Sequence, residues 1–327
     1  MKGRVNRRAW LGTASTLGLL SCAEQKRPRQ TSSAASTVAV LKATSYESEL
    51  LGKLEEGMKA AWPEAANFVR AKRVVLKPNL VEFDSKTAIN TDPRFTLAAR
   101  ELFLKLGAGS VAIAEGPGHR RDTWDLADQA GYRSLFSDFD RNFTDLNLDD
   151  VEARRAFGNS MDLYLPKTIL SADLVVSLAK MKTHHWAGAT LSMKNFFGIV
   201  PGSIYGWPKN LLHHQGIETS IVELNRIVRN TFAIVDGVVA MEGNGPIQGT
   251  PVPMGTIVMG RDLPAVDATC ARLMRLAPEK IGYLRDAAEL GLGNIEESAI
   301  EQRGEKIAGL ARPFAVVSQF SRLRMDS

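Results

Sequence analysis

The fold class follows from RVVLKP at 73–78 and from the two segments after it, TDPRFTLAARELFLKL at 91–106 and SVAIAEG at 110–116. The first and third segments are short apolar runs typical of buried strands. The middle segment repeats apolar residues with helical period, and Thr91-Asp92-Pro93 is a typical helix start with proline in the first turn. A strand, a helix and a second strand in this order favour parallel pairing across a helical crossover.

The same alternation continues along the chain. We predict further strands at 173–179, 232–239 and 256–260, and further helices at 122–131, 217–230, 265–276 and 278–290. The expected fold is α/β and Rossmann-like, with a mostly parallel sheet and helices on both faces. It would occupy 38–327 as one large lobe or two closely packed lobes.

The N-terminus carries export signals. In MKGRVNRRAWLGTASTLGLLSC, Arg7-Arg8 resembles a twin-arginine motif and the last four letters resemble a bacterial lipobox. The apolar part is too short to span a bilayer. We predict a signal peptide over 1–21, cleavage and lipidation at Cys22, and a flexible tether over 22–37. The partners would be the export machinery and, through the lipid, a bacterial membrane at its periplasmic or outer face.

Charge and cysteine content exclude two classes. Processing removes four basic residues and no acidic one, so the formal net charge of +5 over 327 residues falls to +1. No basic face remains for nucleic acid. With Cys22 lipidated, Cys270 has no disulfide partner, and its helical pattern predicts a buried thiol.

Polar residues follow two of the predicted strands, where α/β folds bind ligands. The glycine-rich loop after 110–115 leads to arginines and a helix start, which is either an anion cradle or an ordinary turn. It lacks the third glycine of the dinucleotide fingerprint. The ligand-binding candidates in these two loops are Lys77, Asn79, Glu115, Gly116 and Gly118.

Residues 180–198, KMKTHHWAGATLSMKNFFG, are unusually basic for the end of a buried strand. In an extended chain Lys180, Lys182 and His184 would share one side. Lys194 lies in an apolar context, where a buried ammonium must find acceptors or lose its proton. The alternatives are a solvated strand end and a site for carboxylate or phosphate oxygens, with Lys180 and Asn195 as ligand-binding residues.

Two later loops add acidic residues and a second histidine pair. Asp236 follows a predicted strand, and Glu242 and Gly245 lie in a glycine-rich loop that permits close backbone approach. A metal bound by one histidine of each adjacent pair, with Asp236 or Glu242, is a further candidate. His184 and His214 are the histidines assigned to it, although no H-x-x-x-H spacing accompanies them.

The ordered series of motifs resembles domain of unknown function 362 over about 74–295. The residues that carry the resemblance are Lys77-Pro78-Asn79, Thr91-Asp92-Pro93, Lys180-Met181-Lys182-Thr183-His184, Met193-Lys194-Asn195-Phe196-Phe197-Gly198, Asp236-Gly237, Met241-Glu242-Gly243-Asn244-Gly245-Pro246, Asp262 and Asp267. Some members of that family carry iron-sulfur clusters, for which this chain lacks the cysteines.

The family is also similar at fold level to the N-terminal part of nickel-dependent lactate racemase, whose cofactor is a lysine-attached nucleotide holding nickel. That similarity implies the positions to test for a metal or a lysine-attached cofactor, namely Lys180, Lys182, Lys194, His184 and His185. Fold does not determine function, so it implies no reaction.

Two functions remain open. In the first, the protein is an enzyme that acts on a small anion, with Lys182, His184 and Lys194 as catalytic residues. In the second, it is a non-catalytic anion-binding lipoprotein or a partner in a membrane redox assembly. The pocket would be walled by aromatic residues near the basic loop, Trp186, Phe196, Phe197, Tyr205 and Trp207.

Overall fold

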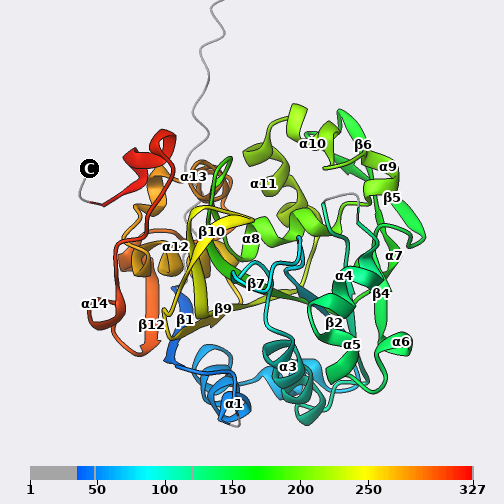
Figure 1. Ribbon diagram of the computed structural model, residues 1–327, viewed down its shortest axis with the longest axis horizontal. Coiled ribbons are helices and arrows are strands. Elements are labelled where there is room, and N and C mark those ends of the chain that lie inside the picture. The colour runs from blue at the N-terminus through cyan, green and yellow to red at the C-terminus, as the bar shows by residue number, and fades with distance from the viewer. Residues whose placement is uncertain (1–34, 48, 119–120, 326–327) are drawn as a thin grey trace, which may run out of the picture.

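A computed structural model describes residues 35–47, 49–118 and 121–325 (Figure 1). The predicted signal peptide, Cys22 and most of the predicted tether lie outside these residues, as do His119 and Arg120 of the predicted anion cradle. Within the described part, no helix is long and apolar enough to cross a membrane.

One ten-stranded sheet runs through the molecule in the order β12-β1-β11-β9-β7-β2-β3-β4, with β10 paired to β9 and β8 paired to β7. Strands β9, β7, β2, β3 and β4 are parallel, whereas β11 is antiparallel to both of its neighbours. The strands of the sheet are β1 (Ser36–Lys42), β2 (Arg73–Pro78), β3 (Ser110–Glu115), β4 (Phe143–Asp145), β7 (Leu174–His184), β8 (Gly188–Thr190), β9 (Thr231–Asn244), β10 (Gln248–Val252), β11 (Thr256–Gly260) and β12 (Ile300–Gly304). A separate hairpin joins β5 (Val151–Ala156) to β6 (Met161–Pro166).

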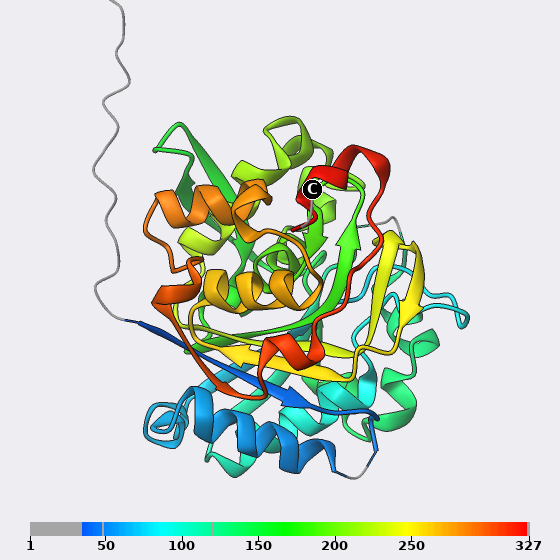
Figure 2. The same ribbon diagram turned by 90° about the vertical axis from the view of Figure 1, so that its left-hand side faces the viewer.

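Helices cover both faces of the sheet. In Figure 2 the blue α1 lies below the sheet, and the gold and orange α12 and α13 lie above it. The α-helices are α1 (Leu50–Ala61), α2 (Ala65–Val69), α3 (Pro93–Lys105), α4 (Thr123–Gln129), α5 (Tyr132–Leu135), α6 (Phe139–Asn142), α7 (Lys167–Leu170), α8 (Ser192–Asn195), α9 (Gly202–Tyr205), α10 (Asn210–His214), α11 (Ile217–Ile227), α12 (Leu263–Leu273), α13 (Gly282–Glu289) and α14 (Ile307–Leu310). Short 3₁₀ turns span Phe196–Ile199, Pro278–Lys280, Glu297–Ala299 and Ser318–Leu323.

The structure confirms the predicted class, a mixed α/β fold with a large, mostly parallel sheet flanked by helices. Asp92 caps α3 by accepting a hydrogen bond from the Arg94 amide, with Pro93 in the first turn. Cys270 is fully buried, as predicted. The sequence analysis did not identify β1, and it did not show that β11 runs antiparallel, since periodicity contains no direction.

The central strand β7 is buried along its whole length, because it has a parallel neighbour on each side and helices on both faces. Its pairing with β9 shifts register between Lys180 and Lys182. On the two sides of this shift, the two lysines line different cavities. Lys180 lines a cavity of about 420 Å³ beside Tyr46, and Lys182 lines a larger cavity described below.

Lys180 and Asp236 form a buried ion pair that joins β7 to β9. Lys180 Nζ lies 2.8 Å from Asp236 Oδ2 and 3.0 Å from the Tyr46 hydroxyl, which donates to Asp236 Oδ1 at 2.9 Å. The side chains of the pair are 2% and 0% exposed, so each charge depends on the other for compensation. These two residues were predicted to bind ligand with the basic loop; in the structure their charges pair with each other, and neither lines the larger cavity.

We expect Lys180→Met to lower the free energy of unfolding by about 3–5 kcal/mol, because it leaves the Asp236 carboxylate buried without a counter-charge. The double variant Lys180→Met/Asp236→Leu should recover most of that loss, since both charges are then absent. Urea unfolding monitored by circular dichroism measures both effects. A single variant as stable as the unmodified protein would show that the pair is not structural.

Candidate functional site

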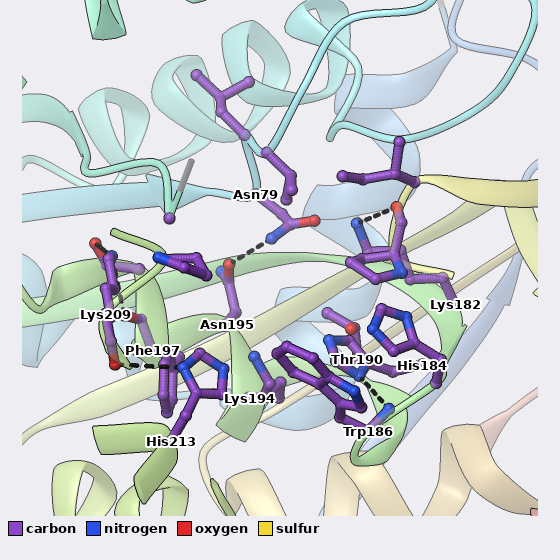
Figure 3. Close-up of a pocket in the computed structure, with 18 of the residues that line it drawn as sticks. Asn79, Lys182, His184, Trp186, Thr190, Lys194, Asn195, Phe197, Lys209 and His213 are labelled. Carbon is purple, nitrogen blue, oxygen red and sulfur yellow. Dashed lines mark hydrogen bonds between the residues drawn. The ribbon is translucent and has the colours of Figure 1, made fainter. Parts of the chain in front are cut away.

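The larger cavity, about 620 Å³ in volume, lies at the carboxyl ends of β2, β3 and β7 (Figure 3). Its lining includes four lysines and three histidines but a single carboxylate. The ionisable residues are Lys77, Lys182, Lys194, Lys209, His184, His185, His213 and Glu115. Cations therefore outnumber anions in a largely buried space.

The only carboxylate that the described residues contribute to the cavity lining is already paired with a lysine. Glu115 Oε2 lies 2.6 Å from Lys77 Nζ and also accepts from the Leu80 amide. The pair is 0% and 1% exposed. Burial lowers the pKa of Lys77, and the charge of Glu115 opposes that effect. Glu115 is thus a structural counter-ion for Lys77, where the sequence analysis had assigned it to a ligand.

Asn195 links this pair to β7. Its Oδ1 accepts from Lys77 Nζ at 3.1 Å, and its Nδ2 donates to the Lys77 carbonyl and to Ser177 Oγ at 2.9 and 3.1 Å. The next loop packs so closely that a Cβ at Gly198 would overlap Lys77 Nζ and Glu115 Oε1. A glycine is therefore required where this turn crosses the ion pair.

Helix α8, which carries Lys194 and Asn195, begins on a buried carboxylate. Asp267 of α12 accepts hydrogen bonds from the Ser192 and Met193 amides at 2.7 and 3.0 Å and from the Ser192 hydroxyl. Burial raises the pKa of Asp267 to about 7, against the effect of these hydrogen bonds. Asp267 thus sets the orientation of the turn that holds Lys194.

The lysines of the lining differ in their acceptors. Lys209 Nζ donates to the carbonyls of Gly116, Phe197 and Gly198 at 2.7, 3.1 and 3.2 Å. Lys182 Nζ donates to the Ile89 carbonyl at 2.8 Å. Lys194 Nζ has no oxygen acceptor among the described residues and lies 4.4 Å from the centre of the Phe197 ring. An anion in the cavity would supply the missing acceptor.

Burial changes the pKa of three of these lysines. It lowers the pKa of Lys182 well below the usual range, and Lys180 and Lys194 lower it further. Burial, assisted by the charge of Lys77, lowers the pKa of Lys194 to about 7. Burial also lowers the pKa of Lys209 to about 7, although Glu115 opposes this. A bound anion would raise all three pKa values by favouring the ammonium form.

Hydrogen bonds determine the tautomers of the three histidines. His184 Nδ1 accepts from the amides of Trp186 and Ala187 at 3.0 and 3.2 Å, so the hydrogen of the neutral ring lies on Nε2. Burial lowers the pKa of His184 well below its usual range, with Lys194 contributing. His184 is therefore a neutral donor; it is not a base. His185 and His213 instead donate Nδ1–H to the carbonyls of Gly245 and Lys209, which leaves an Nε2 lone pair on each.

The two predicted metal ligands do not both line the cavity. The amides of Trp186 and Ala187 donate to His184 Nδ1, which holds the neutral ring in the Nε2–H tautomer. In this tautomer Nε2 has no free lone pair for a metal. His214 is exposed and lies outside the cavity lining, where His213 is found instead. The described residues contain no group of three or more His, Cys, Asp or Glu side chains able to hold a metal ion. A metal bound by His184 and His214 stays a prediction, and it does not enter the proposed function.

The structure brings together most of the predicted site residues. Those that line the cavity are Lys77, Asn79, Glu115, Gly116, Gly118, Lys182, His184, Lys194 and Asn195. Lys180, Asp236, Glu242 and Gly245 do not line it. Glu242 accepts from the Ala315 amide, and the Gly245 carbonyl accepts from the backbone amide and the ring of His185, so both are structural. Of the predicted aromatic wall, only Trp186 and Phe197 reach the cavity.

Lys209 is a cavity residue that the sequence did not predict, and His213 was predicted only as one member of the second histidine pair. They come from the segment of α9 and α10, between two buried elements. Lys209 follows Trp207-Pro208, and a lysine in such a turn is normally solvated. Nothing in the local sequence shows that its ammonium group turns inward to three carbonyls.

The fold and the cavity define an α/β protein with a cationic pocket at the strand ends, and the family follows from comparison. A family model described as "Domain of unknown function (DUF362)" matches residues 74–272. The chain therefore belongs to the DUF362 family. The match ends before residue 295, where the sequence resemblance had placed it.

The chain is also similar to one relative in sequence and to two solved structures in fold. The thylakoid-associated protein sll1697 of Synechocystis sp. is 29% identical over 273 residues, which are 78% of this chain and 80% of that protein. The solved structure of the lactate racemase apoprotein from Thermoanaerobacterium thermosaccharolyticum superposes with a TM-score of 0.48 at 13% identity, over 72% of this chain and 57% of that one. A protein from Thermotoga maritima gives a TM-score of 0.38 at 11% identity, over 74% and 58%. The chain thus spans less than two thirds of either solved structure.

Replacing Lys194 by methionine should change how stability depends on pH. Because the pKa of Lys194 is about 7 in the folded state and 10.5 ordinarily, the folded chain binds fewer protons than the unfolded chain between these values. The lowered pKa therefore decreases the free energy of unfolding by its full amount below about pH 7, and by progressively less toward about pH 10. We expect Lys194→Met to exceed the unmodified protein in free energy of unfolding by on the order of 2 kcal/mol near pH 6, and by much less near pH 10. Urea unfolding at both pH values tests this, and a constant difference would contradict it.

Proposed function

We propose that this protein binds a small organic anion, bearing a carboxylate or phosphate group, in the cavity of about 620 Å³. One observation carries the proposal, namely that four lysines line the cavity with one carboxylate, which Lys77 already occupies. Buried cations are stable only with counter-charge and acceptors, or after loss of a proton. An anionic ligand would satisfy this requirement for Lys182 and Lys194.

Unpartnered polar atoms support the same proposal. Thr190 Oγ1 and Asn79 Oδ1 are buried without hydrogen-bond partners among the described residues, and both side chains line the cavity. Thr190 and Asn79 are 4% and 7% exposed, so water at the surface does not account for them. A ligand with a hydroxyl or carbonyl group beside its charged group would supply partners to both.

The remaining lining fits a carbon skeleton. Trp186 is 52% exposed and lies against the rings of His185 and His213, with centroid distances of 4.9 and 5.0 Å. Phe197 and Ile247 add apolar surface. The volume is within the range of about 300–1,000 Å³ typical of small-molecule sites. The cavity therefore accommodates an organic acid or a phosphorylated metabolite, and inorganic phosphate would fill only part of it.

We further propose that the protein works at a membrane surface. Support comes from the twin-arginine and lipobox motifs in residues 1–22, which would export the chain and anchor it through Cys22. The relative from Synechocystis sp. is named as thylakoid-associated, which is compatible with such a location. Mass spectrometry of the mature N-terminus from the native host tests this, and an uncleaved chain would refute it.

Sulfate is a probe for the anion site. We expect Lys182→Met and Lys194→Met each to weaken sulfate binding by about 10-fold or more, because each removes a charge-assisted hydrogen bond worth roughly 1.5–3 kcal/mol. Lys306→Met is the matched control, since Lys306 is exposed and does not line the cavity. Isothermal titration calorimetry measures the affinities, and circular dichroism verifies that each variant is folded. Equal affinity in all three variants would refute the site.

Sulfate affinity should also depend on pH. Sulfate keeps its charge across the neutral range, whereas Lys194 and Lys209, with pKa values of about 7, lose theirs as the pH rises. We expect the affinity to fall by about 10-fold between roughly pH 6.5 and pH 8.5, with uptake of protons on binding at the higher pH. Titration in buffers of different ionisation enthalpy measures that uptake. A constant affinity across the range would exclude these lysines as ligands.

A further inference from the structure

Lys194 differs from every other lysine of the cavity lining. Lys77, Lys182 and Lys209 donate to oxygen atoms of the protein, whereas the Lys194 amine has none within reach in the described part of the chain. An ammonium group carries a full charge and three hydrogens that need acceptors, whereas a neutral amine carries no charge and only two hydrogens. The surroundings of Lys194 therefore favour the amine, whose nitrogen has a free lone pair.

The amine is also held in place and open to the cavity. Its helical turn is anchored by Asp267, and its side chain extends along the Phe197 ring. Figure 3 shows Lys194 between His213 and Phe197 on one side and Trp186 on the other. Burial, together with the charge of Lys77, lowers the pKa of Lys194 to about 7. A desolvated lysine beside another cation is a typical arrangement for a nucleophilic amine.

We propose that Lys194 forms an imine with the carbonyl carbon of an aldehyde or ketone that also bears a carboxylate or phosphate. This rests on the proposed anion site and names the class of ligand for it. The lysines that retain their protons hold the anionic group, and the Lys194 nitrogen faces the carbonyl. The unpartnered Thr190 hydroxyl and the Nε2–H of His184 line the same cavity and are donors for the carbonyl oxygen.

The step balances without an oxidant or reductant. The lone pair of Lys194 forms a bond to the carbonyl carbon, and the carbonyl π pair moves to oxygen, which takes a proton. The nitrogen then loses hydrogen as the hydroxyl leaves as water, so amine and carbonyl give imine and water. His213, whose Nε2 lone pair is free when the ring is neutral, lines the same cavity and is a suitable proton acceptor.

Borohydride trapping tests the proposal. The full-length protein is incubated with pyridoxal 5′-phosphate or with pyruvate, reduced, and analysed by intact mass and peptide mapping. We expect one saturable adduct, located on Lys194, absent in Lys194→Arg and retained in Lys306→Met. Excess sulfate should slow its formation by about 10-fold or more, since both anions would compete for the same lysines. Adducts spread over exposed lysines, or confined to Lys182 or Lys209, would overturn the proposal.

Two further measurements separate imine formation from anion binding. Propionaldehyde, which has no anionic group, should label Lys194 at least about 10-fold more slowly at equal concentration. Equal rates would mean that Lys194 is merely reactive and would overturn the assignment of an anionic carbonyl ligand. If sulfate binds with the expected dependence on Lys182 but no adduct forms, the imine is refuted and the anion site stands. If sulfate does not bind, the proposed function fails as well.

Discussion

Buried lysines are the constraint on which this end of the molecule depends. Lys77, Lys180, Lys182 and Lys209 are each at most 2% exposed. A buried ammonium is tolerated only when a carboxylate or several carbonyl oxygens replace its water. Lys77 and Lys180 use carboxylates, and Lys182 and Lys209 use backbone carbonyls. Each of these pairings brings together two chain segments that are distant in sequence. The lysines therefore hold the loops at the strand ends in contact with one another.

Lys194 is the exception, and the exception defines the site. Asp267 accepts a hydrogen bond from the Met193 amide in the same helical turn, and Gly198 packs closely against Lys77 and Glu115 just after that turn. The Lys194 amine nevertheless has no oxygen partner among the described residues. An anion in the cavity would supply that partner. The structural lysines around it add positive potential, which favours both an anion and an uncharged neighbouring amine. Anion recognition and amine reactivity therefore have one physical origin.

The strand register separates two polar sites that are adjacent in sequence. Alternation along an extended chain places Lys180 and Lys182 on the same side, and the sequence analysis accordingly assigned both to one ligand site. The register shift between β7 and β9 falls between them, so Lys180 meets Asp236 and Tyr46 while Lys182 turns to the larger cavity. Glu115 was likewise assigned to a ligand, because a sequence does not show that a cation lies opposite it.

Sequence alone determined the α/β class, five strands of the sheet (β2, β3, β7, β9 and β11), five of the longer helices (α3, α4, α11, α12 and α13), the burial of Cys270 and a cluster of basic residues at the carboxyl end of β7. These follow from local periodicity, capping and the order of elements, which depend on neighbouring residues only. Tertiary structure alone decided which lysines are neutralised, which histidine tautomers occur, and that Lys209 and His213 join the cavity. Those outcomes depend on contacts between residues far apart in the chain, such as Lys77 with Asn195 and Lys209 with Gly116. Burial then shifts the pKa of each ionisable group according to the partners that it meets.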